Sequence, residues 1–383
     1  MNRFKTVIAV FLVVGLVLGG SFPILAANPP GSQLPGLEKV LADTCAYLLK
    51  TVPNPRAGSG GSEWAVIGLA RAGYEVPGWY ESYYKALKTE VEGKNGVLHD
   101  KKYTEYSRAI LALTAIGKDP ADVGGYNLLA KLGDFEKVLS QGINGPLFAL
   151  LALDAGNYAI PECAGAKVQT TRELLLGAII DQQLPDGGFS LGGKEGDADI
   201  TAMVLQALAP YQEHAAVKTA IDKALVCLSR LQDSDGGYKG FGEAATLESD
   251  VQVLIALAAL DINPAVDSRF IKNGKTIIDH LLEYALPGGG FKHVLEQTGP
   301  DSMATEQAIC GLVAYDRYLK GKKGFYEMTD VVDSLIPVGR QSPGLAGLTG
   351  KNLAVKVSPF VVLLEILRGG KVGRDFFCSC FAA

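Results

Sequence analysis

Two carboxylates stand close together at the start of an apolar segment, in the string Asp197-Ala198-Asp199-Ile200-Thr201-Ala202. A carboxyl group that is desolvated and has a second carboxylate beside it can stay protonated near neutral pH and act as a general acid. Asp and Thr at a helix start have another use, because their oxygens accept hydrogen bonds from free backbone N–H groups and complement the helix dipole. Asp197 and Asp199 are therefore the candidate catalytic residues, and helix capping is the competing interpretation.

Two histidines occupy similar sequence positions, since His99 follows Gly96 by three residues and His293 follows Gly290 by three. At one opening of a fold, a neutral imidazole could ligate a metal ion. Two solvent-exposed loop histidines are the alternative. The Cys and His residues do not converge in a zinc pattern, so we expect no metal site. The other candidate ligand-binding residues are acids near expected helix starts: Glu248, Asp250 and Asp301.

The elements that must position these residues repeat along the chain. Six stretches share one plan, in which a Gly-rich turn leads into an apolar, Ala-rich helix, and they recur about every 48 residues. Their first residues are Gly58, Gly96, Gly142, Gly187, Gly236 and Gly289. Within them, segments 201–209 and 251–260 are apolar on nearly every side, which predicts complete burial.

A second kind of helix alternates with the first. In segment 216–232, apolar residues recur every three or four positions and charged residues fill the opposite side, as in a helix with one solvated face. The same pattern, less regular, is found in segments 37–51, 81–93, 127–140, 172–183 and 275–286.

The alternation predicts an all-α fold. An α6/α6 toroid, with six buried helices inside and six amphipathic helices outside, would hide every apolar face over residues 28–320. A superhelical solenoid is the alternative, but it needs polar terminal repeats, and segment 37–51 is too apolar for that role. Residues 321–383 then form a C-terminal extension that could pack on the toroid.

The first 27 residues have the pattern of a signal peptide. Arg3 and Lys5 precede an apolar run over 7–18, and Leu25-Ala26-Ala27 resembles a cleavage site. We therefore expect a secreted or cell-surface protein. An uncleaved anchor is the alternative, but the apolar run is short against the ~20 residues that span a bilayer. After removal of the signal we expect no transmembrane span.

Composition excludes several classes of protein. Lys+Arg 36 against Asp+Glu 41 gives a net charge of −5, which argues against a nucleic-acid partner. Apolar residues at 48% and charged residues at 20% argue against a disordered chain. The six cysteines are too scattered for a disulfide framework. We expect Cys45, Cys227 and Cys310 to be buried in helices and Cys163 to lie in a loop. Near the end of the chain, Cys378 and Cys380 lack partners for metal or redox chemistry.

Two of the turns share the pattern Q-x-x-D-G-G-aromatic, 49 residues apart. The motif residues are Gln183, Asp186, Gly187 and Phe189, and Gln232, Asp235, Gly236 and Tyr238. The pattern resembles the Q-x-x-D-G-x-W repeat of squalene and oxidosqualene cyclases and of protein prenyltransferase β subunits, which share the α/α toroid. The resemblance implies a structural role, in which the Gln caps a helix end and the aromatic ring packs against it.

The string at Asp197 resembles the D-x-D-D-T-A motif of squalene-hopene-type cyclases, whose middle Asp protonates an alkene. That resemblance implies Asp199 as the acid, but Ile200 replaces the last Asp. The buried helices also carry few of the aromatic rings that stabilise carbocations. More distantly, the string Asp199 to Leu205 resembles helices of intrinsic factor and transcobalamin, which implies a corrinoid ligand. The chain past Lys320 shows no run of strands like their β domain.

These observations together favour an exported prenyltransferase and squalene-cyclase-like repeat protein that acts as a non-catalytic ligand-binding or cell-surface module. Its partner would be an apolar or corrinoid-like small molecule, or a cell-surface component. No cofactor is required, although a corrinoid is compatible with the resemblance. The alternative is a terpenoid-cyclase-like or prenyltransferase-like enzyme that uses Asp197 and Asp199 at the mouth of a cavity.

Overall fold

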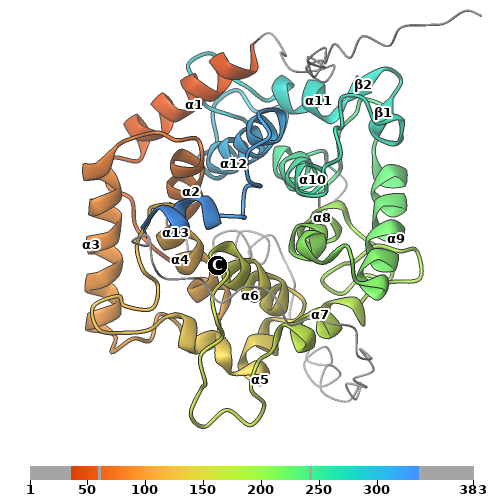
Figure 1. Ribbon diagram of the computed structural model, residues 1–383. Coiled ribbons are helices and arrows are strands. Elements are labelled where there is room, and N and C mark those ends of the chain that lie inside the picture. The colour runs from red at the N-terminus through yellow and green to blue at the C-terminus, as the bar shows by residue number, and fades with distance from the viewer. Residues whose placement is uncertain (1–35, 59–61, 241–243, 336–383) are drawn as a thin grey trace, which may run out of the picture.

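The computed structural model describes residues 36–58, 62–240 and 244–335. Six helices form an inner ring in which each packs on the next and the last returns to the first (Figure 1). They are α2 (Glu63–Arg71), α4 (Thr104–Ala115), α6 (Asn144–Ala155), α8 (Ala198–Leu208), α10 (Leu247–Ala259) and α12 (Ser302–Leu319). The prediction of an all-α toroid is confirmed. The expected signal peptide, Cys378 and Cys380, and the extension beyond residue 335 lie outside the described residues.

The inner helices run parallel to one another. The charges of Glu248 and Asp250 in the first turn of α10 contribute to the raised pKa of Asp199 in the first turn of α8, and the charge of Glu105 of α4 contributes to that of Glu63 of α2. All six N-terminal ends therefore face one opening of the ring, which we call the N-terminal mouth. The positive ends of six helix dipoles meet there, and this favours acidic side chains.

Amphipathic elements surround the inner ring. The longer ones are α1 (Leu37–Thr51), α3 (Pro77–Gly93), α7 (Arg172–Ile180), α9 (Ala215–Leu231) and α11 (Ile277–Glu283). Shorter pieces are α5 (Phe135–Val138) and the 3-10 turns η1 (Leu129–Gly133), η2 (Leu139–Gln141), η3 (Ala209–Tyr211) and η4 (Ser268–Phe270). A last short helix, α13 (Thr329–Leu335), lies instead over the inner ring, beside α2 and α4 (Figure 1). Strands β1 (Ile271–Lys272) and β2 (Lys275–Thr276) form a small antiparallel hairpin ahead of α11.

The outer layer is less regular than six continuous helices. The helix expected over 127–140 is broken, because Gly133 and Asp134 pair with a distant segment. The carbonyl of Gly133 accepts the Thr170 N–H at 2.8 Å, and the Phe135 N–H donates to the Val168 carbonyl at 3.1 Å. Asp134 is extended at this point, and its carboxylate then caps the short α5.

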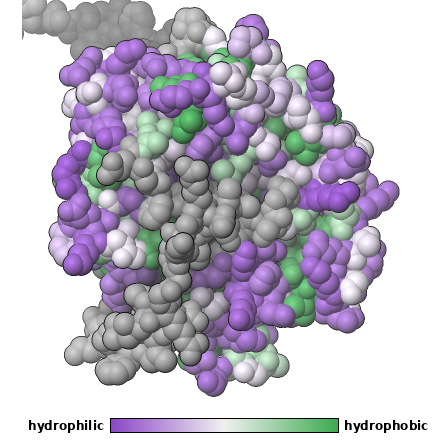
Figure 2. Space-filling model, turned by 180° about the vertical axis from the view of Figure 1, so that it is seen from behind, coloured by the Kyte–Doolittle hydropathy of each residue, from purple (hydrophilic) through white to green (hydrophobic). Residues whose placement is uncertain are grey.

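The inner helices are buried on all sides, as their composition predicts. Every residue of α8 is buried, and in α6 all but Asp154 are. The described surface in Figure 2 is mostly hydrophilic, with hydrophobic residues scattered over it. Of the described cysteines, Cys45, Cys227 and Cys310 are buried, as expected, and Cys163 is half-buried. In this part of the chain no single helix is long and apolar enough to cross a membrane, although 135–141 and 144–155, bent by 120°, reach that length together.

Three turns hold the inner helices by one repeated contact. The N–H of Phe189 donates to the Thr201 hydroxyl, that of Tyr238 to the Asp250 carboxylate, and that of Phe291 to the Thr305 hydroxyl, each at 2.9 Å. The three aromatic side chains are fully buried. The inner-helix residues that accept these bonds stand at matching positions in their repeats.

The glycines and glutamines of these turns contact the next outer element. Gly187 has a φ of 89°, and a Cβ there would lie 2.7 Å from the Lys223 carbonyl oxygen of α9, so only glycine fits. The amide of Gln183 donates to the Gly187 carbonyl at 2.9 Å and to the Ala220 carbonyl of α9 at 2.8 Å. Gln232 does the same with Gly236 and Phe270. The motif thus joins one repeat to the next.

The two motif aspartates differ in the number of hydrogen bonds and ion pairs that they form. They are therefore a matched pair for stability measurements. Asp186 accepts the N–H groups of Gly188 and Gly196, each at 3.1 Å, and pairs with Arg230 at 2.7 Å. Asp235 accepts only the Gly237 N–H at that distance, and its side chain is 56% exposed. We expect Asp186→Ala to lower the free energy of unfolding by about 1–3 kcal/mol, and Asp235→Ala by about 1 kcal/mol or less. Equal losses in urea denaturation would contradict this account.

Residues 323–330 lie across the C-terminal ends of α2 and α12. Arg71, which is 3% exposed, donates to the carbonyls of Gly324, Phe325 and Glu327, and Arg317, 6% exposed, donates to that of Lys323. Both guanidinium groups also bind the Asp330 carboxylate, at 2.7 Å and 2.6 Å. One partly exposed carboxylate therefore neutralises two buried cations.

The shared carboxylate should matter for stability. Removing it in Asp330→Ala leaves two buried cations without their counter-charge, and we expect a loss of about 1–3 kcal/mol, reduced because Asp330 is partly exposed. Asp330→Asn keeps an acceptor and should lose less. Thermal unfolding of both variants measures the difference, and an unchanged melting temperature in Asp330→Ala would show that the carbonyl contacts suffice.

Candidate functional site

The first turn of α8 gives Asp197 and Asp199 different roles. Asp197 has an extended backbone and is the N-cap, since its Oδ1 accepts the Ile200 N–H at 2.7 Å. Its backbone N–H donates to the Phe189 carbonyl at 3.0 Å, which fixes it beside the turn. Burial raises the pKa of Asp197 to about 6. The capping interpretation therefore accounts for Asp197.

Capping does not account for Asp199. Its side chain is 1% exposed, and its Oδ1 has no hydrogen-bond partner. Burial raises the pKa of Asp199 to about 8, with a further contribution from the charge of Asp197, and a hydrogen bond from Ser249 only partly opposes this. The carboxyl group is thus mostly protonated at neutral pH. It can donate a proton or a hydrogen bond through the oxygen that the protein leaves unpaired.

A buried carboxylate on α10 faces this group. Glu248 is 3% exposed, and its Oε2 lies 2.8 Å from Nδ1 of His293, while its Oε1 has no partner. The hydrogen bond to Glu248 raises the pKa of His293. The His293 loop is in turn attached to α10, because its carbonyl accepts the Leu247 N–H at 3.1 Å. Asp199, Glu248 and His293 are thus grouped at the N-terminal mouth.

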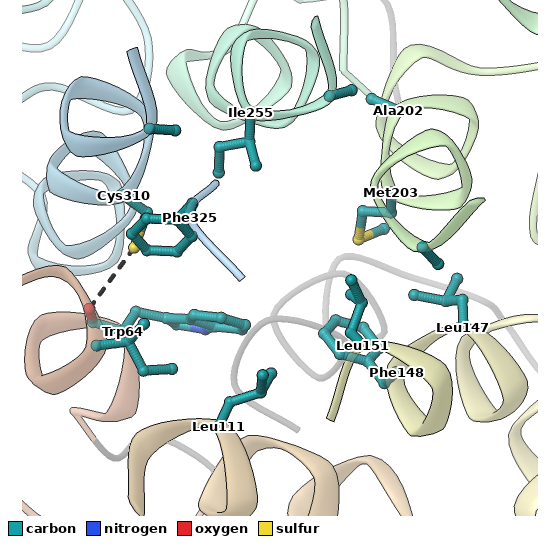
Figure 3. Close-up of a cluster of buried hydrophobic side chains, with 14 of the residues drawn as sticks. Trp64, Leu111, Leu147, Phe148, Leu151, Ala202, Met203, Ile255, Cys310 and Phe325 are labelled. Atoms are coloured by element: carbon teal, nitrogen blue, oxygen red, sulfur yellow. Dashed lines mark hydrogen bonds between the residues drawn. The ribbon is translucent and has the colours of Figure 1, made fainter. Parts of the chain in front are cut away.

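These acids lie on the helix faces that point to the ring axis. Residues four or seven positions apart share a face of an α-helix. Met203 follows Asp199 by four positions, and Ile255 follows Glu248 by seven; both point toward the ring axis in Figure 3. The carboxyl groups therefore stand above an apolar lining.

That lining is mainly aliphatic, with three aromatic rings, those of Trp64, Phe148 and Phe325. Figure 3 shows Leu111, Leu151, Met203 and other side chains directed toward the axis from different inner helices. Trp64 of α2 and Phe148 of α6 meet with their ring centroids 6.3 Å apart. Tyr211 of η3 and Tyr315 of α12 are instead bound through their hydroxyls to Asp154 and Asn263.

A row of glutamines crosses the inner wall, a feature that the sequence analysis missed. Gln206 Nε2 donates to the backbone carbonyl of Gln252 at 2.8 Å and to its Oε1 at 3.0 Å, and Gln252 Nε2 donates to Gln307 Oε1 at 3.3 Å. We call these three residues the glutamine belt. The available signal was a polar residue recurring in apolar helices at spacings of 46 and 55, close to the repeat length.

A second acidic group occupies the same mouth where α12 meets α2. Burial raises the pKa of Glu306 to about 8, with a contribution from the charge of Glu63. Burial also raises the pKa of Glu63, although Arg108 and a hydrogen bond from the Gly58 N–H oppose this. These acids had no motif around them and were not predicted from sequence.

The remaining predicted site residues have structural partners. Asp250 accepts the Tyr238 N–H, and its other oxygen lies 2.6 Å from Nδ1 of the buried His280. Asp301 is the N-cap of α12 and accepts the Ala304 N–H at 2.9 Å. Nδ1 of His99 accepts the N–H groups of two following lysines, each at 3.0 Å.

The two loop histidines are bound at separate places, His99 in the loop before α4 and His293 beside α10. In the described ranges no group of three or more His, Cys, Asp or Glu side chains is arranged to hold a metal ion. A surface pocket of about 260 Å³ lies elsewhere, between α9 and the end of α10, and its lining includes Lys218, Asp222 and Leu260.

The described residues form an all-α toroid with a group of buried acids at one mouth. No family model matches the chain, and no curated protein does. Among solved structures, a similar chain is the type II terpene cyclase MstE from Scytonema in complex with its product, merosterolic acid A. The two share 15% sequence identity over 74% of this chain and 97% of that chain, with a TM-score of 0.46. A likeness at that level says nothing about the activity of this chain.

Titration of Asp199 should make stability depend on pH. Its pKa of about 8 in the folded state exceeds the value of about 3.9 expected for an unfolded Asp. Between those values the folded state holds the extra proton, so raising the pH destabilises it. We expect Asp199→Asn to gain stability relative to wild type from about pH 5 to about pH 8, by at most about 1.4 kcal/mol per pH unit. Urea denaturation at each pH measures this, and a constant difference would contradict it.

Proposed function

We propose that the protein binds an apolar, terpenoid-like molecule along the axis of its helical ring and presents Asp199 to it as a proton donor. One observation carries this proposal. The Asp199 carboxyl is buried, mostly protonated at neutral pH, unpaired at Oδ1 and placed on the axis-facing side of α8. Capping leaves that arrangement unexplained, so the cyclase-like alternative has better support than a purely structural use of this residue.

The surroundings favour the protonated state through physical effects that a cyclase acid needs. Desolvation penalises the charged form, and the neighbouring Asp197 and Glu248 penalise it further. Once Asp199 has given up its proton, the same neighbours favour its reprotonation. Because the lining below is apolar, the acid would act where water does not compete.

A second candidate is the non-catalytic binding role that the sequence favours. Ile200 supports it, because this residue is buried at the position where the resembled motif carries another carboxylate. A carboxyl with a pKa near 8 is also a weak acid toward an alkene. In that role Asp199 would hydrogen-bond the ligand without transferring its proton. We further propose a secreted or cell-surface location, on the basis of residues 1–27.

A metal or corrinoid is not part of this proposal. His99 uses Nδ1 to accept two backbone N–H groups, and His293 uses its own to pair with Glu248. The two imidazoles therefore do not converge on one ligand. The apolar molecule and the protonated carboxyl suffice for either candidate role.

Asp199→Asn separates the two roles. Turnover of squalene or a prenyl diphosphate by the purified protein would be followed by mass spectrometry, and binding by the fluorescence of Trp64. If Asp199 is a proton donor, we expect turnover to fall at least about 100-fold in the variant while binding is kept. Asp301→Asn, which alters a capping carboxylate of α12, is the matched control and should keep full turnover.

The other outcomes are equally informative. Binding without turnover in the wild-type protein would favour the non-catalytic role. No change in Trp64 fluorescence with any of these compounds, together with no co-purified apolar molecule, would overturn the proposal as a whole.

A further inference from the structure

The glutamine belt is deeply buried in an otherwise apolar wall. Gln206, Gln252 and Gln307 are 4%, 5% and 2% exposed. Each contributes an amide that must find hydrogen-bond partners away from water. A buried amide N–H without a partner is destabilising, because it has lost its hydrogen bonds to water. Such a row therefore lowers stability unless every donor has an acceptor.

One donor of the belt remains unused. Gln252 donates its Nε2 to Gln307 Oε1, and Nε2 of Gln307 then has no hydrogen-bond partner. An amide nitrogen carries two N–H groups and cannot accept, so only an acceptor atom can satisfy it. The chain of hydrogen bonds thus runs from α8 through α10 and ends on α12 in a free donor.

The free donor lies near the ring axis. Gln307 precedes Cys310 by three positions, Gln252 precedes Ile255 by three, and Gln206 follows Met203 by three. Figure 3 shows Cys310, Ile255 and Met203 around the ring axis. Because residues three apart lie about 60° from each other on a helix, the belt lies between the axis and the helix contacts.

We propose that Gln307 is the polar contact of a ligand-binding subsite inside the ring. Its side-chain amide donates a hydrogen bond to a neutral oxygen on an otherwise apolar molecule. This inference rests on the proposed binding of a terpenoid-like molecule along the axis. It adds the chemical class of the ligand, an oxygenated isoprenoid such as an alcohol, ether or ketone, in place of a pure hydrocarbon.

The acids at the N-terminal mouth favour a ligand with a neutral oxygen over one with an anionic group. Glu248 and Glu306 are almost fully buried at the opening, and the protein leaves Oε1 of Glu248 unpaired. An anionic diphosphate that entered there would be repelled by the Glu248 carboxylate, and the belt carries no cation to pair with it. A hydroxyl, ether or carbonyl oxygen meets no such repulsion, and it supplies the acceptor that Gln307 lacks.

Three probes test the inference on the whole protein: geranylgeraniol, its methyl ether and the corresponding hydrocarbon. Dissociation constants come from Trp64 fluorescence, since Trp64 points into the ring in Figure 3. We expect the alcohol and the ether to bind about tenfold more tightly than the hydrocarbon, because both carry the acceptor. Gln307→Met should abolish that preference and leave the affinity for the hydrocarbon nearly unchanged.

Gln182→Met is the matched control, because it makes the same substitution at an exposed glutamine outside the inner ring, and it should preserve the tenfold preference. Preference for the alcohol over both the ether and the hydrocarbon would show that a carboxylate accepts a hydrogen bond from the ligand hydroxyl. This result would overturn the role of Gln307. Equal binding of all three probes overturns the subsite and keeps the proposed function. Binding of none overturns both. Because a protonated Asp199 could also donate to both oxygens, the comparison is repeated with Asp199→Ala. A preference that survives in this variant assigns the donor to Gln307 even if Gln307→Met does not fold, and a preference that disappears overturns the role of Gln307.

Discussion

Closure of the inner ring between α12 and α2 is the contact on which the rest of the structure depends. A Cβ at Gly68 would lie 2.5 Å from Cγ2 of Ile309, so the close approach of these helices requires glycine at that position. Arg317 donates to the carbonyl of Arg71 across a sequence separation of 246 residues. Joining elements so far apart costs conformational entropy, which the buried contacts of the seam must offset. The enclosed axis, and any site on it, exists only because the ring closes.

Closure also explains why acids collect at one opening. Parallel inner helices bring six positive dipole ends together, and each can stabilise a carboxylate in its first turn. Asp197 and Asp301 use this arrangement as ordinary caps. Asp199 and Glu306 are buried further, and burial raises the pKa of each to about 8. Groups held in an unfavourable environment reduce stability, and folds often retain them where chemistry or binding requires a perturbed acid.

The sequence led to part of the site and missed the rest for identifiable reasons. A local sequence motif pointed to Asp197 and Asp199. Whether Asp197 caps the helix and whether Asp199 is shielded from water depend on contacts that form only in the folded chain. Glu248 was recognised by its place in the repeat. The glutamine belt escaped notice because a single Gln in an apolar helix forms no motif. The three glutamines form a belt only through hydrogen bonds between residues that are 46 and 55 positions apart in the sequence.

By itself the sequence determined the all-α class, the alternation of buried and amphipathic helices, and the glycine turns, because helical periodicity and positive-φ positions are local properties of the chain. Only the tertiary structure decided where the outer layer breaks, since Gly133 and Asp134 leave the helix to pair with residues 168–170. It also decided the protonation of Asp199, because a pKa depends on solvent exclusion and neighbouring charge. Here α10 supplies the neighbouring Ser249 and Glu248 from the following repeat.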